Sequence, residues 1–147
     1  MSLFPVLLMI HIALAVALLL PSVALPFVLR RSSGPSGLAR FLMAMQGTGT
    51  LVIGLGLAVT GAAMLWLLGP ELLTQPWLLV ALTIYAINLL VAGLISRPNL
   101  RRLAHVGTGG DDDAWRRRAR RQRWVAYGMA AAIGLIGFLM STKPQLW

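Results

Sequence analysis

The chain has 147 residues, of which 58% are hydrophobic and 12% are charged, and it contains no cysteine. A soluble domain usually has about 25% charged residues, so the composition predicts an integral membrane protein with a single transmembrane domain over residues 1–147, and it excludes disulfides and thiolate metal sites. The net charge of +9 borders long apolar segments, so we expect it to meet the anionic headgroups of a lipid bilayer and not nucleic acid.

Two apolar segments in the first half of the chain are each long enough to cross a membrane as a helix, which takes about 20 residues. The first covers residues 3–29 and has no charged residue. Pro21 and Pro26 lie in its last third, and we expect them to bend or loosen that end. The second covers about residues 41–68 and is expected to stop at Gly69-Pro70.

Two further spans lie in the second half of the chain. The third covers about residues 77–96 and is expected to stop at Arg97-Pro98. The fourth covers about residues 124–141, and its helix is expected to begin near Asp112 and to be about 43 Å long, so that its first turns project from the membrane. The run Asp111-Asp112-Asp113 follows the glycine-rich breaker at 107–110 and supplies the expected N-cap and acidic first turn.

The basic residues indicate the orientation of the chain. All 12 arginines lie in the segments 30–40 and 97–123, which connect the first span to the second and the third span to the fourth. Because basic loops stay on the cytoplasmic side, we expect both segments to be cytoplasmic loops and both termini to be outside, with Lys143 as the basic residue there. The sequence thus predicts an all-α, multi-pass protein of the bacterial cytoplasmic membrane, folded as an antiparallel four-transmembrane-helix bundle, N-out and C-out.

Six arginines are concentrated directly before the fourth span. A contact with lipid headgroups or with a partner protein is one interpretation of this segment, and a role in fixing the orientation alone is the other. The six are Arg116, Arg117, Arg118, Arg120, Arg121 and Arg123.

Polar residues inside the predicted spans are few, and none in a span core is Asp, Glu, Lys or Arg, which argues against a proton pump. Counting about eight residues inward from the expected outer end of each helix gives one layer. It contains His11, Thr60, Tyr85 and Ile133, with Gly61 and Gly134 beside them. Neutral imidazole ligates haem iron and glycine admits a flat ring, so a haem b on His11 is one hypothesis. A histidine hydrogen-bonded to another helix, for example to Tyr85, is the alternative.

The second span is rich in glycine. Small residues recur at seven-residue spacing and form a broad face that allows close approach of helix backbones. We expect this face to pack the four helices together, or to dock another subunit or a flat cofactor. Its glycines are Gly47, Gly49, Gly54, Gly56 and Gly61.

Several short motifs carry a family resemblance. They are His11, the glycine-rich second span, Pro76-Trp77-Leu78-Leu79, Arg97-Pro98 and the closing Met140-Ser141-Thr142-Lys143-Pro144. The chain resembles a family of uncharacterised predicted four-helix integral membrane proteins of bacteria, distantly similar to the copper-resistance D proteins and to the HemJ-type protoporphyrinogen oxidases. In those oxidases a first-span histidine is associated with haem b and a third-span lysine is expected for activity. His11 matches the histidine, whereas Ala81 follows Val80 where the lysine is expected.

Three functions remain open. The sequence favours a non-catalytic subunit that packs in a larger membrane complex, with a redox complex as one kind of partner and haem on His11 as one hypothesis for its cofactor, which is otherwise unknown. A haem-dependent membrane oxidoreductase like the HemJ-type enzymes is the alternative, so the question of enzymatic activity stays open. A copper or small-solute transporter is the third, although Met43 and Met45 are the only close pair of methionines and Cu(I) sites usually need clustered soft ligands.

Overall fold

The computed structural model describes residues 3–31, 36–106 and 112–143, and nearly all of them are helical. In chain order the elements are α1 (Leu3–Arg31), α2 (Gly37–Ala44), η1 (Met45–Gly49), α3 (Thr50–Leu68), η2 (Pro70–Thr74), α4 (Pro76–Val91), η3 (Ala92–Ser96), α5 (Arg97–Val106) and α6 (Asp112–Thr142). The π-helical segments η1 and η3 join their neighbours without a break, so α2–η1–α3 and α4–η3–α5 are two long helices. Within the described residues, four helices are therefore long and apolar enough to span a membrane, as predicted.

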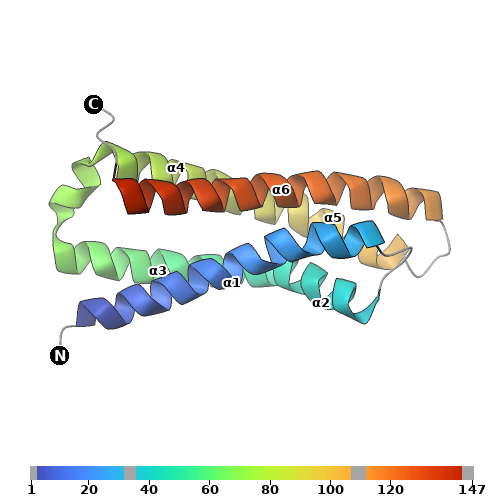
Figure 1. Ribbon diagram of the computed structural model, residues 1–147, viewed down its shortest axis with the longest axis horizontal. Helices are drawn as coiled ribbons and strands as arrows, with labels where there is room; N and C mark the ends of the chain where they lie inside the picture. Colours follow the sequence, from blue (N-terminus) through green and yellow to red (C-terminus); the bar gives the residue numbers. More distant parts are fainter. Residues whose placement is uncertain (1–2, 32–35, 107–111, 144–147) are drawn as a thin grey trace.

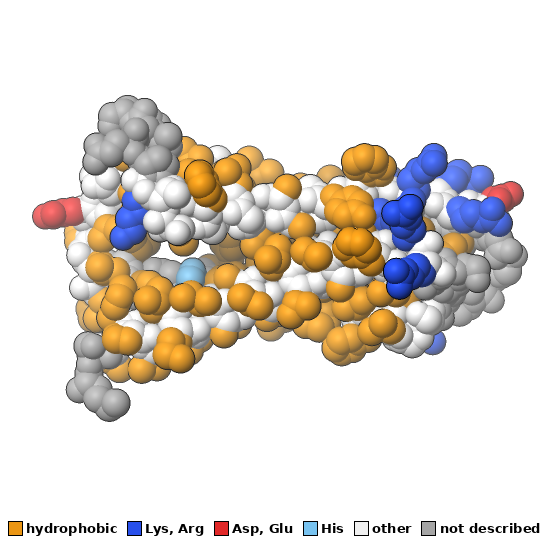
Figure 2. Space-filling view, viewed as in Figure 1, with side chains coloured by type: hydrophobic (Ala, Val, Ile, Leu, Met, Phe, Trp, Pro, Cys, Tyr) orange, Lys and Arg blue, Asp and Glu red, His pale blue; other side chains and the backbone are white. Residues whose placement is uncertain are grey.

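The four long helices form an antiparallel bundle, with the start of α1 and the end of α6 at the same end (Figure 1). α1 packs on α3 and α6, and α4 packs on α6. Arginine side chains gather at the other end of the molecule (Figure 2). We call this the arginine end and the opposite end the Lys143 end.

One stripe of α6 is buried in the bundle. Its buried residues recur at intervals of four, three, four and three, which keeps a single helix face toward the neighbouring helices. They are Trp115, Ala119, Gln122, Ala126 and Met129. The stripe explains why this helix runs unbroken from the arginine-rich segment into the span, as the sequence predicted.

The third long helix does not stop at Arg97-Pro98, so that prediction is wrong. It passes through the π-helical segment Ala92–Ser96 and continues as α5 to Val106. Pro98 has no N–H to donate to the carbonyl four residues earlier, and in a regular α-helix its ring would clash with that carbonyl. In the wider π-turn the N–H of Arg97 bonds the carbonyl of Ala92, and the helix passes the proline without ending.

The basic segments 30–40 and 97–123 are not simple loops. α1 extends to Arg31, and α2 begins at Gly37, where the Ser36 hydroxyl accepts a hydrogen bond from the N–H of Ala39 at 3.2 Å. Apolar residues between the arginines make these turns helical by burying one face in a shared core at the arginine end. The core contains Leu25, Leu29, Ala39, Leu42, Met43, Leu100, Leu103, Trp115 and Ala119.

Two other predictions concern the end of α3 and the prolines inside α1. α3 ends at Leu68 as predicted, because Gly69 adopts a φ of 101°, which favours glycine. α1 stays α-helical through the buried Pro21 and Pro26, so its last third is not loosened. Segment 107–110, the first residue of the acidic run at 111 and residues 144–147 lie outside the described part of the chain.

Candidate functional site

His11 lies half-buried on α1 and is hydrogen-bonded to α3. Its Nδ1 is 2.8 Å from the Oγ1 of Thr60, and the same hydroxyl is 2.9 Å from the carbonyl oxygen of Gly56 and 3.1 Å from that of Leu57. A hydroxyl has one proton, and Thr60 donates it to its own helix, as threonines in helices commonly do. The tautomer in which Nδ1–H of His11 donates to Thr60 is compatible with this geometry, and in that tautomer Nε2 carries the lone pair.

The imidazole ring lies against the backbone of α3. A Cβ placed on Gly61 would be 3.5 Å from Cε1 of His11, so glycine leaves ordinary contact space beside the ring. One turn earlier, a Cβ on Gly56 would be 3.3 Å from a methyl carbon of Leu14. The close approach of α1 and α3 therefore depends on small residues at these positions.

The surface is hollowed between the α1–α3 pair and the α4–α6 pair in the half of the bundle near the Lys143 end. Figure 2 shows this hollow with a histidine side chain at its edge. His105, the other histidine, belongs to α5 at the arginine end. The arrangement thus combines an imidazole with a space flanked by apolar helices.

The predicted layer is only partly assembled. The structure brings His11, Thr60 and Gly61 together, whereas the hydroxyl of Tyr85 donates to the carbonyl of Gly54. Gly54 precedes Thr60 by six residues, about 9 Å along the helix, so the partner of His11 is not Tyr85 as the alternative supposed. Gly134 is exposed on α6, with nothing within 4 Å of a Cβ built there.

The glycine-rich face of the second long helix contacts three other parts of the bundle. Gly54 faces α4, where a Cβ would meet Leu89 at 2.5 Å, and Gly47 faces α5, where it would meet Leu100 at 3.6 Å. Gly56 and Gly61 face α1, and Gly49 meets only the preceding turn of its own helix. This face therefore packs the bundle internally except at Gly49.

A buried polar network crosses the bundle near the arginine end, and sequence analysis did not single it out. The Nδ2 of Asn99 donates to Oε1 of Gln122 at 2.8 Å, and the Nε2 of Gln122 donates to the hydroxyl of Ser96 at 2.9 Å. All three side chains are buried. The signal was the position of Gln122, which takes a place in the apolar stripe of α6 although arginines surround it in sequence.

Two further amides lie buried in the bundle. Nε2 of Gln46 is 3.8 Å from the sulfur of Met129, and its Oε1 has no hydrogen-bond partner. The Nδ2 of Asn88 is also buried without a partner. These neutral amides do not titrate near neutral pH, so they supply no acid or base.

The residues that the structure describes form no metal site of several acidic, histidine or cysteine ligands. Among the described residues there is no group of three or more histidine, cysteine or acidic side chains that could hold an ion. Met43 is buried in the core at the arginine end, and Met45 lies two residues further along the helix, where side chains do not face each other. The described part of the chain therefore brings no cluster of metal ligands together and gives the copper hypothesis no support.

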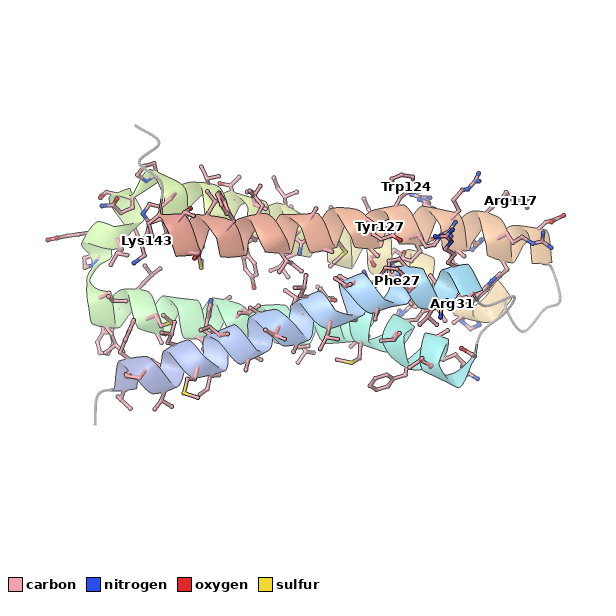
Figure 3. The ribbon with its side chains drawn as sticks, viewed as in Figure 1. Phe27, Arg31, Arg117, Trp124, Tyr127 and Lys143 are labelled. Atoms are coloured by element: carbon pink, nitrogen blue, oxygen red, sulfur yellow. The ribbon has the colours of Figure 1, made fainter. Side chains whose placement is uncertain are left out.

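The arginine-rich first turns of α6 adjoin a band of exposed aromatic side chains. Figure 3 shows Phe27 of α1 beside Trp124 and Tyr127 of α6, with Arg31 and Arg117 nearer the arginine end. The rings of Trp124 and Tyr127 pack edge to face, with 6.4 Å between the ring centroids. Aromatic rings next to arginines are typical of the boundary between the apolar core and the headgroups of a bilayer.

The six arginines on α6 point in several directions. Arg116, Arg117, Arg120 and Arg121 are exposed, and Arg118 and Arg123 are half-buried. They are spread around the helix and form no single surface, so a contact with lipid or with a partner stays a prediction for them.

Comparisons with known proteins identify one family. The model of a family described as predicted integral membrane protein (DUF2269) matches residues 5–144. No curated protein and no solved structure matches the chain. The match supports the expected four-helix membrane family, and it gives no support to the more distant similarity to the copper-resistance D proteins and the HemJ-type oxidases.

Proposed function

Because the chain belongs to this family of predicted integral membrane proteins, we propose that it is a non-catalytic subunit of a larger membrane complex and that His11 holds a haem b there. The observation that carries the proposal is the 2.8 Å contact between Nδ1 of His11 and the Thr60 hydroxyl, because in the tautomer that donates to Thr60 the Nε2 atom is available to a ligand. A haem would supply one-electron redox chemistry, which the side chains of this bundle lack.

The residues around His11 fit a haem ligand. Thr60 fixes the orientation and the tautomer of the ring, the usual role of the hydrogen-bond partner of a ligating histidine. Gly61 leaves the space beside the imidazole open. Because His105 lies in α5, this chain does not place a second histidine there. Met64, half-buried one turn beyond Thr60, or a residue of a partner subunit would be the candidate for a second ligand.

A subunit role agrees with the side chains that the bundle contains. Ala81, where the HemJ-type oxidases are expected to have lysine, is a buried alanine with 1% of its surface exposed. A lysine there would need a charge partner or a path to water, and α4 has no charged residue. The haem-dependent oxidoreductase is thus the second candidate, and catalysis by it would need groups from another protein.

The orientation follows from the charges. In this proposal the arginine end faces the cytoplasm of a bacterium and the Lys143 end faces outward. The aromatic band near Trp124 supports that boundary, and Trp66, with 86% of its surface exposed, marks the other one. His11 then lies in the outer half of the membrane.

Purification after haem-replete expression tests the cofactor. We expect a Soret band from the wild type and its loss in His11→Ala, because the only imidazole in that half of the bundle is removed. His105→Ala is the matched control and should keep the band. A wild type without Soret absorbance, or a band that survives His11→Ala, would contradict the haem assignment.

Purification in mild detergent tests the subunit role. We expect the chain to co-purify with at least one other membrane protein in a fixed ratio. A single monomeric species at every detergent concentration, with or without a Soret band, would contradict a place in a larger complex.

A further inference from the structure

A groove of about 240 Å³ opens at the arginine end between α2–η1 and α5. Three arginines line it: Arg40 from α2, and Arg97 and Arg101, which lie one turn apart on α5. Apolar and small residues, among them Met43, Gly47 and Leu100, form the rest of its wall. The long helices thus bring cations together that are almost 60 positions apart in sequence.

No acidic side chain lines this groove, so its positive charge is not neutralised by the described part of the chain. Nε of Arg97 is buried and has no hydrogen-bond partner. A buried guanidinium nitrogen without an acceptor is costly, and an anion with several oxygens would satisfy it. Arg40 and Arg101 are exposed, so their guanidinium groups are free to approach the same anion.

The groove lies where the exposed surface changes from apolar to basic, which is the pattern expected at the level of bilayer phosphates. Toward the middle of the bundle the same helix exposes apolar side chains, with Leu94 72% exposed and Ile95 39%. In the other direction it exposes Arg101 and Arg102. Phe41, which follows Arg40 in α2, is 60% exposed, as expected for a ring at a membrane boundary.

From this geometry we propose that the groove binds one anionic phospholipid. Its phosphate lies among the guanidinium groups of Arg40, Arg97 and Arg101, and its acyl chains follow the exposed apolar surface near Leu94. Arginine suits this role because its planar fork donates two parallel hydrogen bonds to phosphate oxygens. The apolar part of the wall favours a lipid over a soluble phosphate, which would bring no tail to cover it.

Gly47 keeps the groove open. A Cβ at this position would lie 3.6 Å from Cδ1 of Leu100 and 4.0 Å from Cγ of Arg97, so a longer side chain would extend across the floor. Gly47→Leu therefore tests the shape of the groove without changing its charge. Gly128→Leu is the matched control, because nothing lies within 4 Å of a Cβ built at Gly128.

The test is a lipid titration of the delipidated full-length protein, followed by native mass spectrometry, with phosphatidylglycerol and phosphatidylcholine as probes. We expect one phosphatidylglycerol to bind more tightly than phosphatidylcholine. Arg40→Gln/Arg101→Gln should weaken it about tenfold or more, since each arginine near a headgroup contributes appreciably. Gly47→Leu should weaken it as well. Arg30→Gln/Arg31→Gln removes the same charge from exposed positions at the end of α1, outside the groove, and should leave the affinity unchanged.

Three results would overturn the proposal. Equal weakening by Arg30→Gln/Arg31→Gln would show a diffuse attraction to the basic end. Displacement of the lipid by inorganic phosphate would assign the groove to a soluble anion. Equal affinities for phosphatidylglycerol and phosphatidylcholine would show that the arginines do not select an anionic lipid. Because no variant alters His11, the outcome is independent of whether the protein binds haem.

Discussion

The hydrogen bond between His11 and Thr60 joins residues that are 49 positions apart in the chain. Spacing along each helix predicted that the two share a layer, because each lies about eight residues from one end of its span. The rotation of a helix about its axis is not given by that count. The structure therefore decided which hydroxyl meets the imidazole, and it is Thr60 and not Tyr85.

Thr60→Val tests the role of this hydroxyl within the proposed haem site. Valine has the shape of threonine but no acceptor, so His11 loses the bond that fixes its ring. We expect the affinity for haem to fall about 10- to 100-fold, the usual effect of removing the partner of a ligating histidine. Titration with haem followed by the Soret absorbance measures it.

Thr83→Val is the matched control for that variant. The hydroxyl of Thr83 also donates to the carbonyl four residues earlier, with 2.8 Å between Oγ1 and the carbonyl oxygen of Leu79. Thr83 is exposed on α4 and has no histidine partner. It should bind haem like the wild type. Identical affinities for Thr60→Val and Thr83→Val would show that the hydroxyl does not position the imidazole.

At the scale of the elements, the main difference from the sequence prediction is the continuous helix through Arg97-Pro98. A proline is a sound stop signal for a regular α-helix. It failed here because the π-turn at Ala92–Ser96 removes the clash, and the buried Ser96–Gln122–Asn99 network holds the next turn against α6. Side chains far away in sequence thus decided where this helix ends.

Gln122→Leu tests the contribution of the network. It leaves the polar atoms of Ser96 and Asn99 buried without their partner, and we expect the free energy of unfolding to fall by about 1–3 kcal/mol. Thermal unfolding in detergent, followed by circular dichroism, measures the change. Gln75→Leu is the control at an exposed glutamine near the opposite end. An equal melting temperature for both variants would show that the network does not stabilise the fold.

At the scale of the whole molecule, charge is separated along the bundle. The arginines occupy one end, and Lys143 lies at the other (Figure 3). The first and third long helices end at the arginine end, and the second and fourth begin there. Both basic segments, which connect these helix pairs, therefore lie on the same side. This separation follows from the sequence order of apolar and basic segments alone.

Single-cysteine labelling tests the proposed orientation. Because the chain has no native cysteine, only the introduced cysteine can react with the label. Thr74→Cys lies in the exposed turn η2 at the Lys143 end and should react with an impermeant maleimide added to intact cells. Arg102→Cys, exposed on α5, should react only after the membrane is permeabilised. The reverse pattern would place the arginine end outside.

The sequence by itself determined the class of the protein, the four spans and their antiparallel order, because hydropathy and charge act on whole segments against the bilayer. It also named His11, Thr60 and Gly61. Tertiary structure decided the rest: which side chains meet, where the arginine-rich segments become helical, and that Arg40 and Arg97 share a groove. These depend on helix rotation and on contacts between distant segments, which local periodicity does not specify.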